Sequence, residues 1–315
     1  MIINDDAWLE LLEVRATEPT AIDSALAART PRPLLASDGN TFIIAIDHPA
    51  RGMVGISGQP FVMADRRDVL ERTMTALANP GVDGVMATPD IIDDLALLGA
   101  LDDKVAIGSI NRGGLTGSAW ELDDQLTGHT VPSIVDQGLD GGKMLLRIDL
   151  DDERSRPTIE ACARWITELA AAQKLAMLEP LPYTTSVEGR KVLDTDDDAL
   201  VKCVGIANAL GASSAYTWLK LPATAQVERV MAATSLPGLI LGGAPGPDPE
   251  TAFDEWRRAM VVPNVRGLVV GRSLLYPADG DVAAAVATAA AIVHPDQFRP
   301  DPSPPDPSPP DQGIS

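Results

Sequence analysis

The stretch 214–222 reads Ser-Ala-Tyr-Thr-Trp-Leu-Lys-Leu-Pro and is typical of a short β-strand. Its Tyr-Thr-Trp run favours a strand, and Pro222 ends it. Lys220 stands at the carboxyl end, where a lysine is unusual because removing an ammonium group from water is costly. Either Lys220 is an edge residue at the surface or it has a chemical role, and the rest of the chain decides between the two.

The same alternation of apolar runs and helical segments extends to both sides of this stretch. Eight runs are predicted as strands: 42–47, 83–87, 104–110, 143–148, 175–179, 216–221, 238–241 and 267–270. Helices are predicted from about residue 65 and over 90–98, 131–138, 157–173, 196–210, 225–233, 249–260 and 281–293. Apolar strands that alternate with helices indicate a parallel sheet covered by helices. Eight such units over about 250 residues are the number in a closed (β/α)8 TIM barrel.

A doubly wound sheet is the structural alternative. It would place a glycine-rich turn directly after the first strand, but the turn here reads Asp-His-Pro-Ala-Arg-Gly over residues 47–52. We therefore predict the barrel over residues 41–294, preceded by an N-terminal helical extension over residues 1–40. Residues 295–315 contain Asp-Pro-Ser-Pro-Pro twice and are predicted to be a disordered, proline-rich tail.

The formal net charge of −20 argues against a nucleic-acid or anionic membrane partner. The two cysteines, Cys162 and Cys203, give no disulfide framework, and no apolar run is long enough to cross a membrane. We expect a soluble, cytoplasmic protein, and the sequence leaves a homo-oligomer open. An anionic substrate would need a local positive site, because the general field of the protein repels it.

Charged or glycine residues stand at or near the carboxyl ends of six predicted strands, where barrel enzymes carry their catalytic groups. They are Asp47, Lys143 with Arg147, Glu179, Lys220, Gly242 with Gly243, and Gly271 with Arg272. The glycine turns after the seventh and eighth strands can cradle a phosphate with backbone amides, and Arg272 adds a fork that matches phosphate oxygens. Alternatively, these glycines only end their strands.

Lys143 and Lys220 can both point into the barrel. A neighbouring cation and partial burial disfavour the charged ammonium, so Lys220 can act as a free amine that attacks a ketone or aldehyde to form a Schiff base. Alternatively, Lys143 forms a salt bridge with Glu179 or Asp47, which would also orient its partners. Metal chemistry is poorly supported, because the three histidines include no pair at ligand spacing. We predict no metal and no cofactor, although His48 beside Asp47 can belong to the site.

Several of these segments resemble motifs of class I aldolases. The set is similar to the tagatose-bisphosphate aldolase group, within the wider family of deoxyribose-phosphate and archaeal-type fructose-bisphosphate aldolases. The resemblance covers residues 42–276 and lies in Ile-Ala-Ile-Asp-His (44–48), Gly-Gly-Lys-Met-Leu-Leu (141–146), Leu-Glu-Pro (178–180), Trp-Leu-Lys-Leu-Pro (218–222), Leu-Gly-Gly (241–243) and Val-Val-Gly-Arg (269–272). Two segments depart from the family pattern. An acidic residue usual shortly before the Schiff-base lysine is missing from 215–218, and the turn 48–51 is unusual.

The resemblance implies a class I aldolase that cleaves or forms a C–C bond in a phosphorylated ketose or keto-sugar acid, in inositol or sugar breakdown. A 2-deoxy-5-keto-gluconate phosphate from inositol breakdown and tagatose bisphosphate are candidate substrates. It implies that Lys220 forms the Schiff base, Glu179 is the general acid and base, and Lys143 holds Glu179 and favours the free amine of Lys220. Asp47 would orient a substrate hydroxyl or relay its proton. The substrate-binding set would be Gly242, Gly243, Gly271, Arg272, Arg147 and His48.

Three other functions stay open on the same barrel. A phosphosugar isomerase or epimerase would use Glu179 as a base and would not need Lys220 covalently. Transaldolase-like and thiolase-like transferases also use a lysine on the sixth strand. A non-catalytic barrel could bind a phosphosugar as a regulator.

Overall fold

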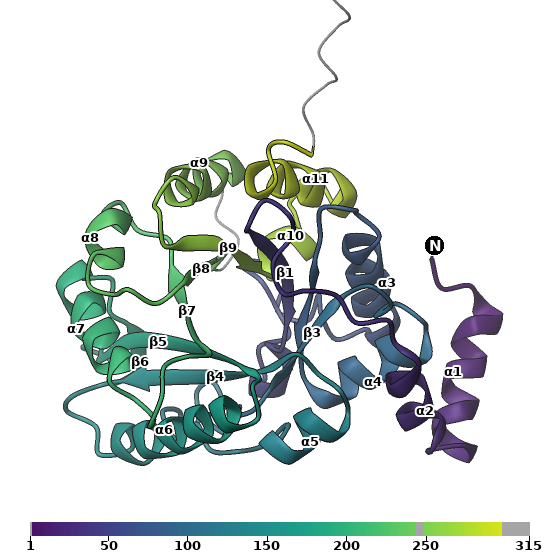
Figure 1. Ribbon diagram of the computed structural model, residues 1–315, viewed down its shortest axis with the longest axis horizontal. Helices are drawn as coiled ribbons and strands as arrows, with labels where there is room; N and C mark the ends of the chain where they lie inside the picture. The colour runs from purple at the N-terminus through teal and green to yellow at the C-terminus, as the bar shows by residue number, and fades with distance from the viewer. Residues whose placement is uncertain (1, 244–247, 298–315) are drawn as a thin grey trace, which may run out of the picture.

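Eight parallel strands close into a ring in the computed structural model, which describes residues 2–243 and 248–297 (Figure 1). The ring runs β4-β3-β2-β1-β9-β8-β7-β5 and closes because β5 pairs with β4. Its strands are β1 (Thr41–Ile46), β2 (Gly84–Ala87), β3 (Val105–Ser109), β4 (Gly141–Ile148), β5 (Leu175–Thr185), β7 (Thr217–Pro222), β8 (Gly238–Leu241) and β9 (Val265–Val270). The predicted (β/α)8 barrel is confirmed, and closure of the ring excludes the doubly wound sheet.

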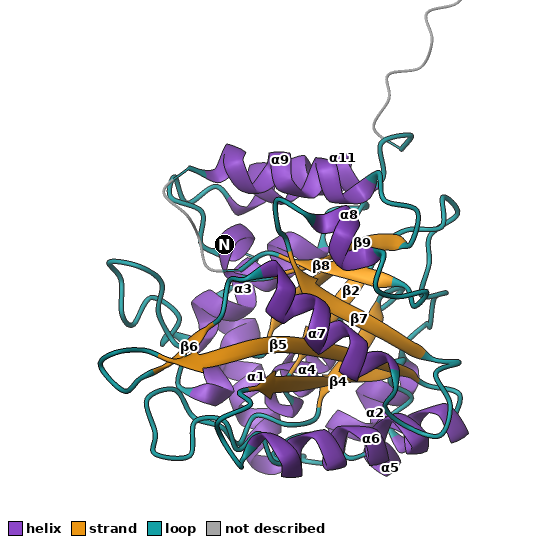
Figure 2. Cartoon of the chain, turned by 90° about the vertical axis from the view of Figure 1, so that its left-hand side faces the viewer, coloured by secondary structure: helices purple, strands orange, loops and turns teal. Residues whose placement is uncertain are grey.

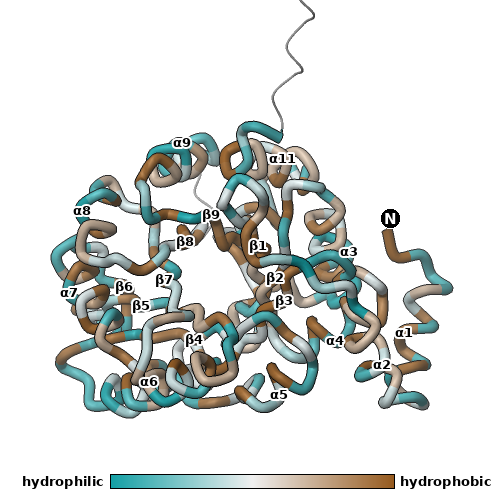
Figure 3. The backbone as a smooth tube through the Cα atoms, in the orientation of Figure 1, coloured by the Kyte–Doolittle hydropathy of each residue, from teal (hydrophilic) through white to brown (hydrophobic). Residues whose placement is uncertain are grey.

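Helices surround the ring on its outer side (Figure 1). They are α3 (Arg66–Leu77), α4 (Pro89–Leu97), α5 (Val131–Asp136), α6 (Ser155–Ala171), α7 (Asp197–Asn208), α8 (Val227–Met231), α9 (Pro249–Met260) and α11 (Val282–Val293), with a short α10 (Arg272–Leu275) after β9. Hydrophobic residues gather on the strands, while the helices alternate between hydrophobic and hydrophilic (Figure 3). The larger apolar core therefore lies between the ring and the helices.

Two helices precede the barrel, α1 (Asp5–Thr17) and α2 (Ala21–Ala28). The side chain of Asn4 caps α1 by accepting a hydrogen bond from the backbone N–H of Ala7. Arg15 ties α1 to α4, because its Nε lies 2.5 Å from Oδ1 of Asp94. At the other end of the chain, the predicted disordered tail lies outside the described residues from residue 298 onward.

Alternate residues of the strands face the inside of the ring, and the deeper part of this inner face is apolar. This apolar floor consists of Ile43, Ala45, Met86, Val105, Ile107, Leu175, Met177, Leu239 and Val269. The next inward positions are polar: Asp47 follows Ala45 by two residues, and Glu179 follows Met177 by two. Side chains on one face of a strand repeat every two residues, so a charged layer lies directly above the apolar floor.

Strand five is longer than its apolar run predicts. It was expected to end at Glu179 but continues to Thr185, where it forms an antiparallel hairpin with β6 (Lys191–Leu193). Tyr183 and the two threonines after it favour extended backbone, and the chain turns back through Gly189 at φ 75°. Figure 2 shows this hairpin extending beyond the other strands. Glu179 therefore lies inside a continuous strand, which fixes its backbone on both sides.

A buried ion cluster closes the opposite end of the barrel. His294, just after α11, contacts Oδ2 of Asp38 through Nδ1 at 2.7 Å and Oδ2 of Asp83 through Nε2 at 2.9 Å. Arg32 also reaches Asp83, at 2.8 Å. Although burial lowers the pKa of His294, its contacts with Asp83 and Asp38 outweigh that effect and raise it. His294 thus ties the end of the last helix to the segment before β1.

We expect His294→Leu to lower the free energy of unfolding by about 3 kcal/mol, because it leaves buried carboxylates without their cation. The pKa of the folded state is raised, so the contribution is complete below the unfolded value of about 6.5 and is lost as pH rises through the folded value. Urea unfolding of both proteins from pH 5 to 9 measures the difference. A difference that stays constant over this range would show that the charge of His294 contributes nothing.

Candidate active site

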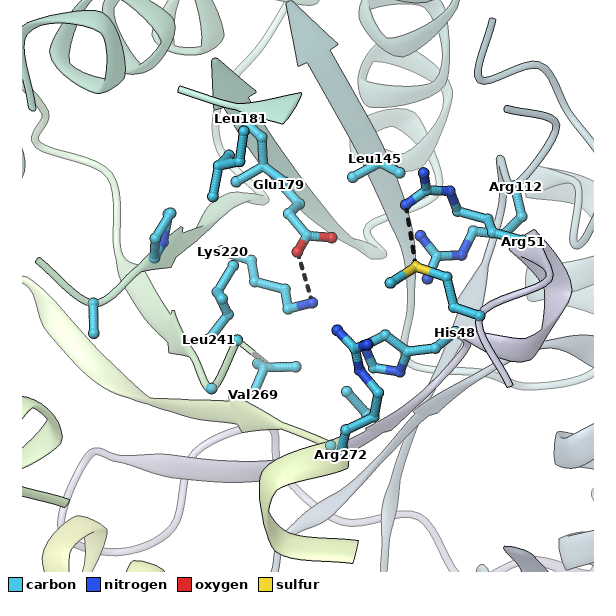
Figure 4. A pocket seen from close by; sticks show the side chains of 18 of the residues that line it. His48, Arg51, Arg112, Leu145, Glu179, Leu181, Lys220, Leu241, Val269 and Arg272 are labelled. Atoms are coloured by element: carbon cyan, nitrogen blue, oxygen red, sulfur yellow. Dashed lines mark hydrogen bonds and ion pairs between the residues drawn. The ribbon is translucent and has the colours of Figure 1, made fainter. Parts of the chain in front are cut away.

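A cavity of about 490 Å³ opens at the carboxyl ends of the strands. Most of the predicted site residues line it, namely His48, Glu179, Lys220, Gly242, Gly243, Gly271 and Arg272. In Figure 4, Lys220 and Glu179 approach each other inside it, and Arg272 and His48 enter from another side. Asp47, Lys143 and Arg147 are fully buried and do not line it. The barrel thus gathers the predicted residues at one end, in two layers.

Glu179 lies between the two predicted lysines. Its Oε1 accepts a hydrogen bond from Nζ of Lys220 at 3.0 Å, and its Oε2 lies 2.5 Å from Nζ of Lys143. Burial raises the pKa of Glu179, but Lys143 and then Lys220 outweigh it, and the pKa falls to about 2. Glu179 is therefore a carboxylate at neutral pH, already in contact with an amine.

The two lysines differ in depth, and strand register explains why. Lys143 pairs with Met177, which belongs to the apolar floor. Lys220 follows Leu219, whose partner Leu178 precedes Glu179, so Lys220 lies one level closer to the cavity. Burial and then Arg112 lower the pKa of Lys143 to about 8, which by itself would favour Lys143 as the free amine. Lys220 is nevertheless the candidate nucleophile, because it is the one of the two lysines that lines the cavity, where a substrate can reach it.

Asp47 follows β1 and belongs to the buried layer. Its carboxylate lies 2.5 Å from Nη2 of Arg112 and 3.3 Å from Nζ of Lys143, and it accepts a hydrogen bond from Oγ of Ser109 at 3.0 Å. Burial raises the pKa of Asp47, yet Arg112 and Lys143 hold it well below its usual range. Asp47 is a fixed anion that anchors two cations beneath and beside the cavity.

One glycine in each of the two turns, Gly242 and Gly271, has no room for a side chain. A Cβ on Gly271 would lie 2.1 Å from the carbonyl oxygen of Ala45, and one on Gly242 would lie 2.3 Å from Cγ1 of Val270. Gly243 has φ 64°, which glycine adopts without strain. Both turns therefore bring bare backbone to the cavity wall, as the sequence suggests for a phosphate.

Arg272 begins α10 and lines the cavity beside these turns (Figure 4). Among the described residues, its guanidinium has no ion pair, and its buried Nε has no hydrogen-bond partner. Burial and then Arg112 lower the pKa of Arg272. A bound anion would give Arg272 the partner that this part of the chain does not supply.

His48 lies against Gly271, where a Cβ would come within 3.0 Å of its Cε1. Burial holds the pKa of His48 well below its usual range, with Arg272 adding to the effect and Asp47 opposing it. The imidazole is therefore neutral at pH 7. Its buried Nδ1 has no hydrogen-bond partner among the described residues, so it can bind a ligand hydroxyl.

Arg147 has partners of its own away from the cavity. Its Nε and Nη2 donate to the carboxylate of Asp124 at 2.8 and 2.9 Å, and its guanidinium lies 5.2 Å from the ring centroid of Tyr183. This ion pair holds Asp124, in the long loop after β3, against Arg147 of β4. The geometry gives Arg147 a positioning role and offers no support for contact with a substrate.

Three cavity residues, Arg51, Arg112 and Tyr183, are not among those that the sequence singled out. Arg112 stands two residues after the predicted third strand, so a search that reached just beyond the strand ends would have found it. Tyr183 lies past the predicted end of the fifth strand. The observed extension of β5 brings it to the cavity.

Within residues 2–243 and 248–297, no three histidine, cysteine, aspartate or glutamate side chains are grouped so that they could hold a metal ion. None of the described helices has both the length and the apolar character needed to cross a bilayer.

The model of the Cgl0159-like family matches residues 39–290. The crystal structure of Cgl0159 from Corynebacterium glutamicum is 50% identical, with a TM-score of 0.91, and covers 94% of this chain and 99% of that one. No curated protein matches.

Aldolase barrels are similar at much lower identity. A Schiff-base-forming fructose-1,6-bisphosphate aldolase is 19% identical with a TM-score of 0.63, covering 86% of this chain and 99% of its own. An archaeal fructose-1,6-bisphosphate aldolase whose catalytic lysine carries a carbinolamine intermediate is 18% identical with a TM-score of 0.64, covering 87% and 99%. At this identity the likeness shows that the fold is shared.

Proposed function

This chain belongs to the Cgl0159-like family, and we propose that it is a class I aldolase whose substrate is a phosphorylated ketose or keto-sugar acid. The observation that carries the proposal is the contact between Nζ of Lys220 and Oε1 of Glu179, 3.0 Å apart at the wall of the cavity. An amine that a substrate can reach, with a carboxylate in hydrogen-bond contact, is what Schiff-base chemistry requires. The aldolase barrels described above support this reading of the fold.

The Lys220–Glu179 pair can make an iminium from a ketone with its protons balanced. Glu179 first takes a proton from the ammonium of Lys220, and the free amine attacks the carbonyl carbon, so that a C–N bond forms. Glu179 gives this proton to the carbonyl oxygen, then carries a second proton from the nitrogen to the same oxygen, which leaves as water. Lys143, 2.5 Å from the other oxygen of Glu179, keeps this carboxylate ionised and in place between transfers.

Cleavage then uses the iminium as an electron sink. Glu179, a carboxylate again, takes the proton of the hydroxyl on the β-carbon. The bond between the α- and β-carbons breaks, its electron pair passes toward the iminium nitrogen to give an enamine, and the β-carbon leaves as an aldehyde. Protonation of the enamine by Glu179 and hydrolysis release the ketone and free Lys220.

The other wall of the cavity supports a phosphorylated substrate. Gly242 and Gly243 follow β8, and Gly271 and Arg272 follow β9. β8 is the hydrogen-bonded neighbour of β7, which carries Lys220, so a phosphate there would sit beside the carbonyl under attack. We therefore assign the phosphate to the ketone fragment.

A screen of phosphorylated ketoses and phosphorylated keto-sugar acids for cleavage tests the proposed function. Release of dihydroxyacetone phosphate is followed by its coupled reduction. An aldolase releases this ketone and an aldehyde in equal amounts, whereas an isomerase or epimerase changes the substrate without releasing either. Isomerisation with no C–C cleavage across the panel would contradict the proposal.

Arg272→Ala should raise KM for the phosphorylated substrate by about 10- to 100-fold and change kcat by much less. A charge-assisted contact with a remote phosphate is formed equally in the ground and transition states, and it contributes about 1.5–3 kcal/mol. Arg272→Lys, which keeps the charge without the fork, should fall between. Steady-state kinetics of the wild type and the two variants measure these values. An unchanged KM for Arg272→Ala would mean that the phosphate binds elsewhere.

A further inference from the structure

Two arginines line the cavity without a part in the chemistry proposed above. Arg51 ends the short turn η1 (Pro49–Arg51) after β1, and Arg112 lies in the loop after β3. In the ring, β2 stands opposite β7, the strand of Lys220, and β1 and β3 flank β2. Both guanidiniums accordingly enter the cavity from the side that faces Lys220 (Figure 4).

The outer nitrogens of Arg51 are weakly engaged. Its Nε donates to the carbonyl oxygen of Gly114 at 2.9 Å, but the only partner of Nη1 among the described residues is the weak acceptor Sδ of Met53, at 3.8 Å. Nη2 lies 3.9 Å from Oε1 of Glu121, beyond hydrogen-bond distance. The residue is nevertheless only 7% exposed, so water satisfies little of it. An anion in the cavity would provide oxygen partners for both nitrogens.

Of three neighbouring arginines, Arg51 is the one without a carboxylate of the described residues within hydrogen-bond distance. Arg112 and Arg147 lie near it, and each has a carboxylate partner, at 2.5 and 2.8 Å. Burial, Arg147 and Arg112 together lower the pKa of Arg51. Glu121 lies 3.9 Å from Arg51 and is shared with Arg147, at 3.6 Å. A negative group on the substrate would give Arg51 the close partner that its two neighbours already have.

A carboxylate matches these features better than a second phosphate. It brings a single charge and two coplanar oxygens, which fit the fork of one guanidinium. A phosphate is a dianion with three free oxygens. Gly242, Gly271 and Arg272 suit a phosphate on their wall, whereas on the Arg51 side Glu121 would repel a second negative charge.

We propose that Arg51 binds a carboxylate at the end of the substrate remote from its phosphate, so that the substrate is a phosphorylated keto acid and not a sugar bisphosphate. This inference rests on the proposed function. In the cleavage step the ketone fragment on Lys220 keeps the phosphate, and the aldehyde fragment departs with the carboxylate. The β-hydroxyl proton passes to Glu179, and the electrons of the broken C–C bond stay with the enamine.

Calorimetric binding of three unreactive probes tests the assignment without any chemistry: 5-phosphonooxypentanoate, pentyl phosphate and pentane-1,5-diyl bisphosphate. The wild type should bind the phosphorylated acid at least about 10-fold more tightly than pentyl phosphate, because one charge-assisted pair contributes that much or more. Arg51→Met should remove this advantage and leave pentyl phosphate unaffected. Arg272→Met should weaken all three probes.

Two further variants separate binding from folding. Arg51→Lys should keep part of the preference for the acid, and Arg229→Met, on the outer surface of α8, should change nothing. The inference is overturned if Arg51→Met leaves the preference intact, if it weakens pentyl phosphate as much as the acid, or if the bisphosphate binds the wild type more tightly than the acid. Because the probes have no carbonyl, failure to form a Schiff base would contradict the proposed function and leave this result standing.

Discussion

Lys220→Ala should lower kcat by roughly 10⁴-fold or more, the scale of loss seen when a covalent nucleophile is removed. Lys220 is the amine that lines the cavity, and neither Lys143 nor Arg272 can replace it. Lys143 is fully buried below it, and the guanidinium of Arg272 is not a nucleophile at neutral pH. The measurement is single-turnover cleavage of the best substrate from the screen, with binding followed separately.

Two variants serve as controls for this loss. Lys220→Arg keeps a cation beside Glu179 but no primary amine, so it should be as inactive as the alanine variant. Lys202→Ala changes an exposed lysine on α7 and should be fully active. Turnover by Lys220→Ala at more than about a hundredth of the wild-type rate would mean that Lys220 has an orienting role only.

Lys143→Met should lower kcat at neutral pH by about 10²-fold or more, the usual scale of a disturbed general acid and base. Burial raises the pKa of Glu179, and among the neighbouring cations that lower it to about 2, Lys143 has the largest effect. Without this ammonium the pKa of Glu179 should rise. The wild type should therefore show no Glu179 titration from pH 4 to 9, and the variant should gain an acid limb and recover activity as pH increases.

The profile of kcat/KM against pH makes this measurement, and Lys104→Met is its matched control. Lys104 is a partly buried lysine, whose Nζ donates to the carbonyl oxygen of Val82 at the opposite end of the barrel. Its replacement should leave the profile unchanged. A Lys143→Met enzyme with reduced activity but the wild-type profile would mean that Lys143 only supports packing.

The barrel could be predicted from the sequence because its signal is repeated and local. Each buried parallel strand is a continuous apolar run, and each run is followed by a helix. Errors of a few residues at the ends of a strand therefore do not change the number of predicted strands. That Lys220, Glu179 and Arg272 line one cavity could be predicted as well, since the carboxyl ends of the strands meet at one end of the ring.

Depth and loop contacts could not be predicted in the same way. Lys143 and Lys220 are equivalent in the strand pattern, and only the stagger between β4 and β7 places one below the other. Arg147 shares the inward parity of Lys143, but the loop after β3 folds over it and supplies Asp124 as its partner. No local pattern encodes a contact between residues 23 positions apart.

The most direct test of the account is borohydride reduction in the presence of substrate, followed by peptide mapping of the adduct. Reduction converts an iminium into a stable secondary amine, so the modified lysine keeps the mass of the ketone fragment. We predict one adduct per chain, on Lys220, that carries the phosphorylated fragment and is absent from Lys220→Ala. An adduct on Lys143, or no adduct with a substrate that the enzyme cleaves, would contradict it.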